Sequence, residues 1–508
     1  MDSHYIKRAL TEGSPSPRYA TRGTGLVVAA GTLAMIAGLP VGGNTAVAQT
    51  APDSRPHRYL VVSTTETVRS LQLPVGARAT ALRYPHVGAV VADLTAAQAT
   101  DLDRQAGVTV ARDGLVHAMP VSEDAANRPR STGGGQSPQA AASSWGLDRV
   151  DQRGLPLSGT YTPHLGVDGH GVDAFIIDTG LAAGHPEFTG RVGNGIDIVA
   201  GDADPQDCNG HGTHVAGTIG SSQYGVAAKT ILHGVRVLDC DGGGSLSDVI
   251  AGMDWVVQQR IALGRPVVAN MSLGGGLNAA LNDATSNMVR NDVVTVVAAG
   301  NSADDACNQS PASTPEAVTV AASGRDDSHA WFSNFGSCVD LYAPGVDIVS
   351  TDAFDPNGET TMSGTSMASP HVAGWAALFM SLHPDATPEL TVQALLDSGS
   401  SDKIVGAPAG TANVLPYTQQ MIIRTTAMLS TVTNTALRAD IDPNGVEVDY
   451  TVRGQRRRDG AWVTQWTLST SGDQETLQRE VPSGWWRVLV PAQHGQPRAL
   501  SNAVRIAR

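Results

Sequence analysis

The sequence is short of charge, and most of the charge it has is negative. Charged residues make up 16% of the 508 positions, and 34 Lys and Arg stand against 48 Asp and Glu, which gives a formal net charge of −14. Nucleic-acid binding needs clustered basic side chains that neutralise phosphates, so this balance argues against such a partner. The acidic excess indicates a well-hydrated surface, and some carboxylates are suited to calcium, which prefers oxygen ligands.

The sequence also has no internal repeat array. A length of 508 residues exceeds what one ordinary core accommodates, so it predicts three or four segments. An apolar content of 41% indicates a globular protein, and 56 glycines indicate many tight turns and close backbone approaches.

Long apolar runs are missing except near the N-terminus. There, four basic residues precede an apolar run over 25–39, and the small residues Ala46-Val47-Ala48 follow. This pattern predicts a signal peptide over 1–48 that is removed. The alternative is a membrane anchor, because the run nears the length that spans a bilayer, but Pro40 and the A-x-A site favour removal. Since no later segment is apolar enough to span, we expect a secreted protein without a stable membrane anchor.

Cysteine is scarce, and its number is even. The four cysteines all lie in the central part of the chain: Cys208, Cys240, Cys307 and Cys338. In a secreted chain this indicates disulfides, and the spacing suggests 208–240 and 307–338, although four cysteines allow three connectivities. A competing interpretation is a zinc cluster of Cys208, His211 and His214, because the two histidines share a helix face. The absence of a nearby Glu for an H-E-x-x-H motif argues against it.

The region 49–140 predicts a small α+β unit followed by a processing linker. Hydrophobic periodicity indicates three strands and one helix, near 59–63, 88–92, 108–111 and 95–105. Residues 123–143 are rich in Ala, Ser, Gly, Gln and Arg without periodicity, which is typical of an exposed linker. We expect cleavage there, with a new N-terminus within 131–144.

The region 141–417 alternates between apolar β-branched runs and helical patterns. Strands are expected at 174–177, 231–238, 267–271 and 293–298, and a helix at 247–259. This alternation predicts an α/β domain with a parallel sheet between two helix layers. Sites in such domains lie at the carboxyl ends of the strands, where Asp178, Ser272 and Asn301 fall.

The last segment, 418–508, changes character. Alternating apolar stretches such as 446–452 and 485–490 are separated by turn signals, which predicts a small β-sandwich-like domain. Within it, Arg456-Arg457-Arg458 is interpreted as a solvated turn rather than a binding patch.

Three segments together predict nucleophilic catalysis: Ile176–Gly180, Asn209–Thr218 and Gly364–Pro370. A serine hydroxyl needs a base to take its proton and a carboxylate to orient that base. We assign these roles to Ser366, His211 and Asp178, because histidine exchanges a proton near neutral pH. His214 is expected to be a packed helix residue, and three acids of the preceding loop are expected to be surface groups or minor ligands: Asp202, Asp204 and Asp207.

The chain order Asp, His, Ser and these Gly-rich contexts resemble the subtilisin-like serine proteases of peptidase family S8. The resemblance covers 58–417, and the runs 145–149 and 236–240 are similar to the proteinase K branch, near its two-disulfide, aqualysin-like members. It implies a serine endopeptidase of broad specificity that acts through an acyl-enzyme, without a cofactor for the chemistry. It also implies that 49–140 is an inhibitor I9-like propeptide of a self-processing zymogen, and we expect a monomer.

The same resemblance implies binding roles for further residues. Asn301 would stabilise the oxyanion together with the Ser366 N–H. A peptide substrate would lie as a β-strand against residues that include the primary pocket: Gly242, Gly243, Gly244, Ser272, Leu273, Gly274, Ala298, Ala299 and Gly300. Structural calcium would bind the carbonyls of Pro315 and Ala317 and the carboxylate of Asp340, and a second site would use Asp148, Asp151 and Gln152.

Two rival hypotheses remain at this level. Asp178-Thr179-Gly180 and Asp397-Ser398-Gly399 mimic the paired motifs of aspartic proteases. However, the second copy ends a helical pattern that starts at Thr387, and a carboxylate on a helix end cannot mirror one on a strand loop. The other rival is a catalytically silent relative that binds through its C-terminal segment.

Overall fold

The computed structural model describes residues 55–63, 71–79, 81–119, 142–421, 426–433, 436–442, 451–458, 461–469, 476–490, 499–500 and 504–506. The predicted signal peptide and most of the predicted linker lie outside these residues. Among the helices that are described, none has both the length and the hydropathy needed to cross a bilayer.

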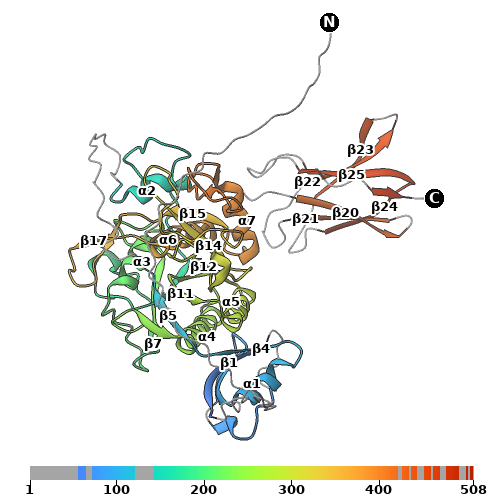
Figure 1. Cartoon of the computed structure of the whole chain (residues 1–508). Coiled ribbons are helices and arrows are strands. Elements are labelled where there is room, and N and C mark those ends of the chain that lie inside the picture. Colours follow the sequence, from blue (N-terminus) through green and yellow to red (C-terminus); the bar gives the residue numbers. More distant parts are fainter. Residues whose placement is uncertain are drawn as a thin grey trace, which may run out of the picture. The chain divides into compact units, whose positions relative to one another are not determined.

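A central parallel sheet organises the region 142–421 (Figure 1). Seven of the described strands form it in the order β15-β14-β12-β10-β6-β8-β7, and every neighbouring pair is parallel. They are β6 (Asp173–Asp178), β7 (Ile196–Asp197), β8 (Ile231–Arg236), β10 (Val267–Met271), β12 (Val293–Ala298), β14 (Val318–Ser323) and β15 (Leu341–Pro344). All four strands predicted for this region are present, and 267–271 and 293–298 have the predicted ends.

Helices cover both faces of this sheet, as the near-continuous apolar strands require. In β6, Ala174 and Ile176 pack into one core, whereas Phe175 and Ile177 pack into the other. The first core contains residues of α3 (His211–Gly220), α6 (Thr365–Leu382) and α7 (Pro388–Ser398), and the second contains residues of α4 (Leu246–Leu263) and α5 (Ala279–Arg290). The prediction of a three-layer α/β domain is therefore confirmed.

The α4 helix illustrates how the sequence sets its ends. Its N-cap Ser245 accepts a hydrogen bond from the N–H of Asp248, and Gly264 ends the helix with a left-handed φ of 60°. The helix is longer than the predicted 247–259, because its last turn stays on the surface without a local stop signal before Gly264.

Short elements connect these layers. They are α2 (Trp145–Val150), β9 (Gly243–Ser245), β11 (Leu273–Gly276), β13 (Gln309–Ser310), β16 (Ile348–Thr351), β17 (Glu359–Met362), β18 (Ser400–Ser401), β19 (Val414–Leu415) and the 3-10 turns His164–Gly166, Pro186–Phe188 and Ala306–Asn308.

The N-terminal module is a separate antiparallel sheet, as described within 55–119. Its order is β2-β3-β1-β4, and helix α1 packs on it. The elements are β1 (His57–Ser63), the 3-10 turn Ala77–Ala79, β2 (Leu82–Tyr84), β3 (Ala89–Leu94), α1 (Ala96–Asp103) and β4 (Val108–Arg112). This agrees with the predicted α+β unit, to which the structure adds β2.

Polar contacts attach this module to α4 and α5. Asp254 Oδ1 accepts hydrogen bonds from the N–H groups of His86 at 2.6 Å and Val87 at 3.1 Å. The amide of Asn287 donates to the Val87 carbonyl at 2.9 Å. At the start of α4, Asp113 accepts from the N–H and the hydroxyl of Ser247. The module therefore rests on the helix layer that covers the second core.

After β4 the chain enters a different sheet. Strand β5 (Leu115–Ala118) pairs antiparallel with both β9 and β11, in the order β13-β11-β5-β9. This strand was not among the sequence predictions, and it leads directly to the candidate site.

The C-terminal segment is rich in strands where it is described. One sheet is β20-β21-β24, and the other is β23-β22-β25-β26 with β27 beside β25. Six side chains from strands of both sheets share one core with Val481, which follows β24, as expected for a sandwich-like unit. The strands are β20 (Thr426–Thr433), β21 (Ala436–Asp442), β22 (Thr451–Arg458), β23 (Ala461–Ser469), β24 (Thr476–Glu480), β25 (Gly484–Val490), β26 (Ala499–Leu500) and β27 (Val504–Ile506).

One prediction in this segment is wrong. Arg456-Arg457-Arg458 is not a turn but the end of β22, where Arg457 lies opposite Trp462 of β23. The strand pairing holds these residues extended, whereas the charge run by itself suggested only solvation.

The cysteines form two disulfides, Cys208–Cys240 and Cys307–Cys338, with Cα–Cα distances of 5.0 and 5.3 Å. Of the three possible connectivities, this is the sequential one that the spacing suggested. Cys208 is therefore not a zinc ligand, and the described residues contain no group of three His, Cys, Asp or Glu that could hold a metal ion.

Candidate active site

Asp178 and His211 lie in direct contact although they come from different elements. Asp178 ends β6, and His211 is the first residue of α3. Their side chains are almost fully buried, and His211 Nδ1 lies 2.8 Å from Asp178 Oδ1. A carboxylate only accepts hydrogen bonds, so Nδ1–H donates to it, and in the neutral ring Nε2 is left as the unprotonated atom. That atom is the one a general base would use.

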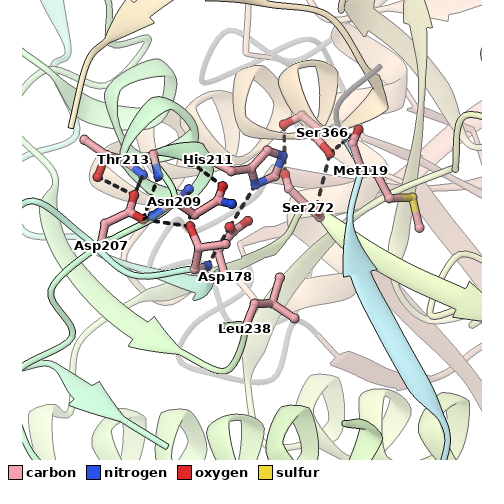
Figure 2. Close-up of polar contacts among 12 residues, drawn as sticks. Met119, Asp178, Asp207, Asn209, His211, Thr213, Leu238, Ser272 and Ser366 are labelled. Atoms are coloured by element: carbon pink, nitrogen blue, oxygen red, sulfur yellow. Dashed lines mark hydrogen bonds and ion pairs between the residues drawn. The ribbon is translucent and has the colours of Figure 1, made fainter. Parts of the chain in front are cut away.

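Ser366 reaches the same site from α6, where it is the second residue after the N-cap Gly364. Its hydroxyl donates to the carbonyl oxygen of Met119 at 2.7 Å and lies 3.1 Å from the carbonyl oxygen of Ser272. Among the described residues His211 Nε2 has no hydrogen-bond partner. In the view of Figure 2 the His211 ring lies between Asp178 and Ser366. The serine hydroxyl is therefore engaged by Met119 instead of by the histidine.

The side-chain amide nitrogen of Asn301 donates to the same Met119 carbonyl. Its Oδ1 accepts from the N–H and the hydroxyl of Thr365, both at 2.9 Å. Because the backbone N–H of Thr365 can only bond an oxygen, the amide is oriented with Nδ2 toward Met119, to whose carbonyl oxygen it donates. The Met119 carbonyl thus lies between two donors, Asn301 Nδ2 and the Ser366 hydroxyl.

The cleft segments predicted from the sequence surround the β5 strand and Met119. On one side His117 and Val116 lie opposite Gly243 and Gly244, and the N–H of Ala118 donates to the Gly242 carbonyl at 2.9 Å. On the other side Ala118 lies opposite Leu273 and His117 opposite Gly274. Met119 N–H points at the Ser272 carbonyl at 3.4 Å. Strand β5 therefore lies between these predicted segments, with the backbone pairing that strand addition gives a bound peptide. Figure 2 shows this strand leading up to Met119.

The third predicted segment lies at the end of β12. Ala298 and Ala299 are buried, and Gly300 has a φ of 105°, which favours glycine. A methyl group built on Gly300 would overlap the amide of Asn334, and one built on Gly274 would overlap the thioether methyl of Met119. The absence of a side chain at Gly274 therefore leaves room for the Met119 side chain, and its absence at Gly300 leaves room for Asn334.

Sequence reasoning missed Met119, Thr365 and the role of Asp207. The apolar run Leu115–Met119 just before the linker was a usable signal for a strand. Asp207 is not a surface acid as predicted, because it is 3% exposed and accepts several hydrogen bonds, whereas Asp202 and Asp204 are exposed.

The second histidine of the motif behaves as predicted. His214 is fully buried in α3, and its Nε2 bonds the carbonyl of Ile348 at 3.0 Å. Burial lowers the pKa of His214 to about 3, so it stays neutral. It has the properties of a packed helix residue.

The candidate calcium ligands include carboxylates that form no ion pair with a cationic side chain of the described residues. Burial raises the pKa of Asp340 to about 6, against a hydrogen bond from the Thr319 N–H at 2.8 Å that lowers it. This hydrogen bond places the Asp340 carboxylate beside Thr319, near the start of β14 and two residues after Ala317. Its chemistry fits a hard cation, which would compensate the buried charge.

At the second candidate calcium site, more of the ligand oxygens already accept hydrogen bonds from the protein itself. Burial raises the pKa of Asp151 to about 6, as the nearby Asp148 also does to a lesser degree. Asp148 accepts from the N–H groups of Ser158 and Gly159, and Gln152 Oε1 accepts from the same Ser158 N–H. Both oxygens of Asp148 accept such bonds, whereas Asp340 accepts one from the described residues, so this set fits a cation less well than Asp340.

The aspartic-protease alternative fails on geometry. Asp178 ends a strand, whereas Asp397 lies in the last turn of α7. The two carboxylates do not occupy equivalent positions, as the helical pattern after Thr387 predicted.

The chain is similar in sequence to known serine proteinases. The family model of the subtilase family, Peptidase_S8, matches residues 169–438, which extends past the predicted boundary at 417. An extracellular serine proteinase of Thermus sp. (strain Rt41A) is 51% identical over 274 residues, and alkaline serine exoprotease A of Vibrio alginolyticus is 52% identical over 273 residues. Both alignments cover 54% of this chain. The chain spans 66% and 50% of the length of these curated relatives.

The chain is also similar to a solved structure of a subtilisin-like proteinase. A cold-adapted subtilisin-like serine proteinase matches with a TM-score of 0.52 and 51% identity, over 54% of this chain and 97% of that one. The family model covers more than half of the chain and includes all three predicted catalytic residues. The chain belongs to the subtilase family.

Proposed function

We propose that this protein is a serine endopeptidase that hydrolyses peptide bonds through an acyl-enzyme. The observation that carries this proposal is the Met119 carbonyl, which lies between Asn301 Nδ2 and the Ser366 hydroxyl, in a cleft beside the His211–Asp178 pair. A substrate carbonyl in that place would have a nucleophile and an oxyanion donor within reach.

Each step of peptide hydrolysis can then be assigned to a residue of the site. Ser366 Oγ attacks the carbonyl carbon, and its proton passes to His211 Nε2. Asp178 holds the ring and stabilises the imidazolium, while Asn301 Nδ2 and the Ser366 N–H stabilise the oxyanion. The imidazolium returns the proton to the leaving amine as the C–N bond breaks. Water then attacks the ester, giving its proton to His211, and the acid is released as the proton returns to Ser366.

We expect broad specificity with apolar residues preferred before the cut. The pairing of β5 uses backbone groups of glycine-rich segments, which makes few demands on side-chain identity. The Met119 side chain against Gly274 supports an apolar pocket for the residue that donates the carbonyl.

We further propose that the N-terminal module inhibits the enzyme as its propeptide. Its residues Leu115–Met119 fill the cleft, and Met119 engages the Ser366 hydroxyl. We keep the maturation cut within 131–144, in the linker. N-terminal sequencing of the secreted protein tests this, and a mature protein beginning at Pro120 would contradict it.

Secretion and structural calcium are part of the same proposal. Two disulfides and the signal-peptide pattern support an oxidising, extracellular environment. A relative's printed name, extracellular serine proteinase, points the same way. The partly buried carboxyl of Asp340, whose pKa burial raises, supports one structural calcium site.

The decisive experiment uses the secreted protein with casein and a peptide anilide. We expect hydrolysis that a serine-directed sulfonyl fluoride abolishes and pepstatin leaves unchanged. Ser366→Ala should remove it, whereas Ser381→Ala, near the far end of α6, should not. Hydrolysis retained in Ser366→Ala would refute the assignment. A chain that binds the peptide without cleaving it would indicate the silent relative instead.

A further inference from the structure

The loop before α3 contains a buried carboxylate that the catalytic scheme does not use. Asp207 is 3% exposed and accepts five hydrogen bonds from described residues. Oδ1 accepts from the Thr179 hydroxyl at 3.0 Å and from the N–H groups of Asn209 and Gly210 at 2.9 and 2.8 Å. Oδ2 accepts from the N–H and the hydroxyl of Thr213 at 2.9 and 2.7 Å. Figure 2 shows these contacts beside His211.

This carboxylate replaces the missing cap of α3. The N-cap residue Gly210 has no side chain, so it cannot satisfy the free N–H groups of the first turn. Asp207 bonds the N–H groups of Gly210 and Thr213, and Asn209 Oδ1 bonds that of His211. The negative charge at the helix N-terminus is also favourable for the helix dipole. The turn that begins with His211 is therefore fixed from outside the helix.

Asp207 also sets the direction of two buried hydroxyls. A carboxylate can only accept, so the hydroxyls of Thr179 and Thr213 must donate to it. Their lone pairs are then free to accept the N–H of Gly212 at 2.9 Å and of Ala182 at 3.0 Å, respectively. Thr179 follows Asp178 directly. Each hydroxyl thus connects the loop after Asp178 to the turn that carries His211.

The two segments pack without spare room. A methyl group on Gly212 would overlap the Gly180 carbonyl, and one on Gly180 would lie 2.5 Å from the Pro205 carbonyl oxygen. Because these hydrogen bonds join the segment after Asp178 to the turn that carries His211, we expect their loss to move Asp178 relative to His211. We propose that Asp207 is a positioning residue that sets the 2.8 Å contact between Asp178 and His211. This inference concerns the same site and rests on the proposed function for its kinetic consequence.

Asp207→Asn is a sharp test because the side chain keeps its shape while one of its two acceptor oxygens becomes an NH₂ group. Whichever way the amide turns, its NH₂ faces backbone N–H donors, either those of Asn209 and Gly210 or that of Thr213. We expect kcat per titrated active site to fall about 100-fold with KM changed less than about twofold, as for an Å-scale misplacement. The matched control is Asp173→Asn, an equally buried carboxylate at the other end of β6 that pairs with His233 and Arg265. It should lower Tm and leave kcat unchanged.

Thr179 provides a second, independent arm. Thr179→Val keeps the shape but removes the bridging hydroxyl, and should lower kcat in the same way. Thr179→Ser restores the hydroxyl and should recover most of the lost turnover. If Asp207→Asn does not fold, the Val and Ser pair decides the question. Folded Asp207→Asn and Thr179→Val proteins that both keep the parental kcat would overturn the proposal.

A spectroscopic readout separates this inference from the proposed function. In the full-length Ser366→Ala protein, the proton on His211 Nδ1 that bonds Asp178 should give a downfield NMR resonance, assigned by its loss in Asp178→Asn. We expect Asp207→Asn to shift or broaden it and Asp173→Asn to leave it in place. If the parental chain hydrolyses no peptide, the proposed function fails, yet this resonance still decides whether Asp207 positions the pair. An unchanged resonance in Asp207→Asn contradicts the positioning role.

Discussion

The carbonyl oxygen of Met119 accepts a hydrogen bond from the Ser366 hydroxyl at 2.7 Å, across 247 positions of sequence. A residue of the N-terminal module therefore occupies the place that the proposed mechanism gives to the substrate carbonyl. The same oxygen accepts from the amide of Asn301. One carbonyl thus contacts the proposed nucleophile and the proposed oxyanion donor, and it belongs to the residue that directly follows β5.

Asn301→Ala should lower kcat while leaving KM nearly unchanged, because the amide bonds an oxygen that becomes charged only during the reaction. We expect kcat to fall by about 10²–10³-fold, the decrease measured in subtilisin when one such donor is removed. Steady-state kinetics per titrated site measure it. Asn413→Ala is the control, since within the described residues its amide bonds only the backbone of Ile404, and the change should affect Tm alone. Equal effects of the two changes on kcat would argue against an oxyanion role.

Gly274→Ala should narrow the pocket that holds the Met119 side chain, since the added methyl would overlap the thioether methyl. We expect kcat/KM for substrates with Met or Leu before the cut to fall about tenfold or more, the range of a few kcal/mol of overpacking. Substrates with Ala there should lose less. Gly276→Ala, in the same strand with open space around it, should change neither. A uniform loss over all substrates would place the Met119 side chain outside the specificity pocket.

Calcium should stabilise the protein more as the pH rises. Burial raises the pKa of Asp340 to about 6, above its usual 3.8, so between about pH 4 and 6 the unfolded chain loses this proton first and the folded state loses stability as the pH rises. A bound cation would offset the buried charge. The increase in Tm on adding calcium should therefore be small near pH 4 and large above pH 6, as measured by scanning calorimetry with and without a chelator.

Asp340→Asn should remove this calcium increment, and Asp151→Asn reports on the second candidate site in the same assay. An increment that does not depend on pH, or that survives both substitutions, would mean that the cation binds elsewhere.

His214→Gln should make the protein more resistant to acid. Burial lowers the pKa of His214 to about 3, so from its usual 6.5 down to that value the unfolded chain takes up the proton and the folded state loses stability as the pH falls. A glutamine amide can still donate to the Ile348 carbonyl without this titration. The difference in Tm between pH 7.5 and 4.5 should therefore shrink, whereas the exposed His170→Gln should leave it as it is. An unchanged difference in His214→Gln would show that other groups control acid unfolding.

Much of the site was visible in the sequence because its signals are local. Asp178 follows an apolar run that can only be a buried strand, His211 lies between glycines that open a helix, and Ser366 precedes a long apolar helix. Asp397, of the second aspartic-protease-like motif, could be rejected for a similar reason, because the residues that precede it have helical spacing.

The sequence by itself determined the alternation of strands and helices and the segments that carry Asp178, His211 and Ser366, because burial and turn formation depend on short-range patterns. Only the tertiary structure decided that Leu115–Met119 lies in the cleft and that Asp207 is buried between two loops. A short, mostly apolar strand has the same local sequence whichever edge it pairs with, and a carboxylate has the same local sequence whether it is solvated or caps a helix. Their environments come from chain segments far away in sequence, which no local pattern specifies.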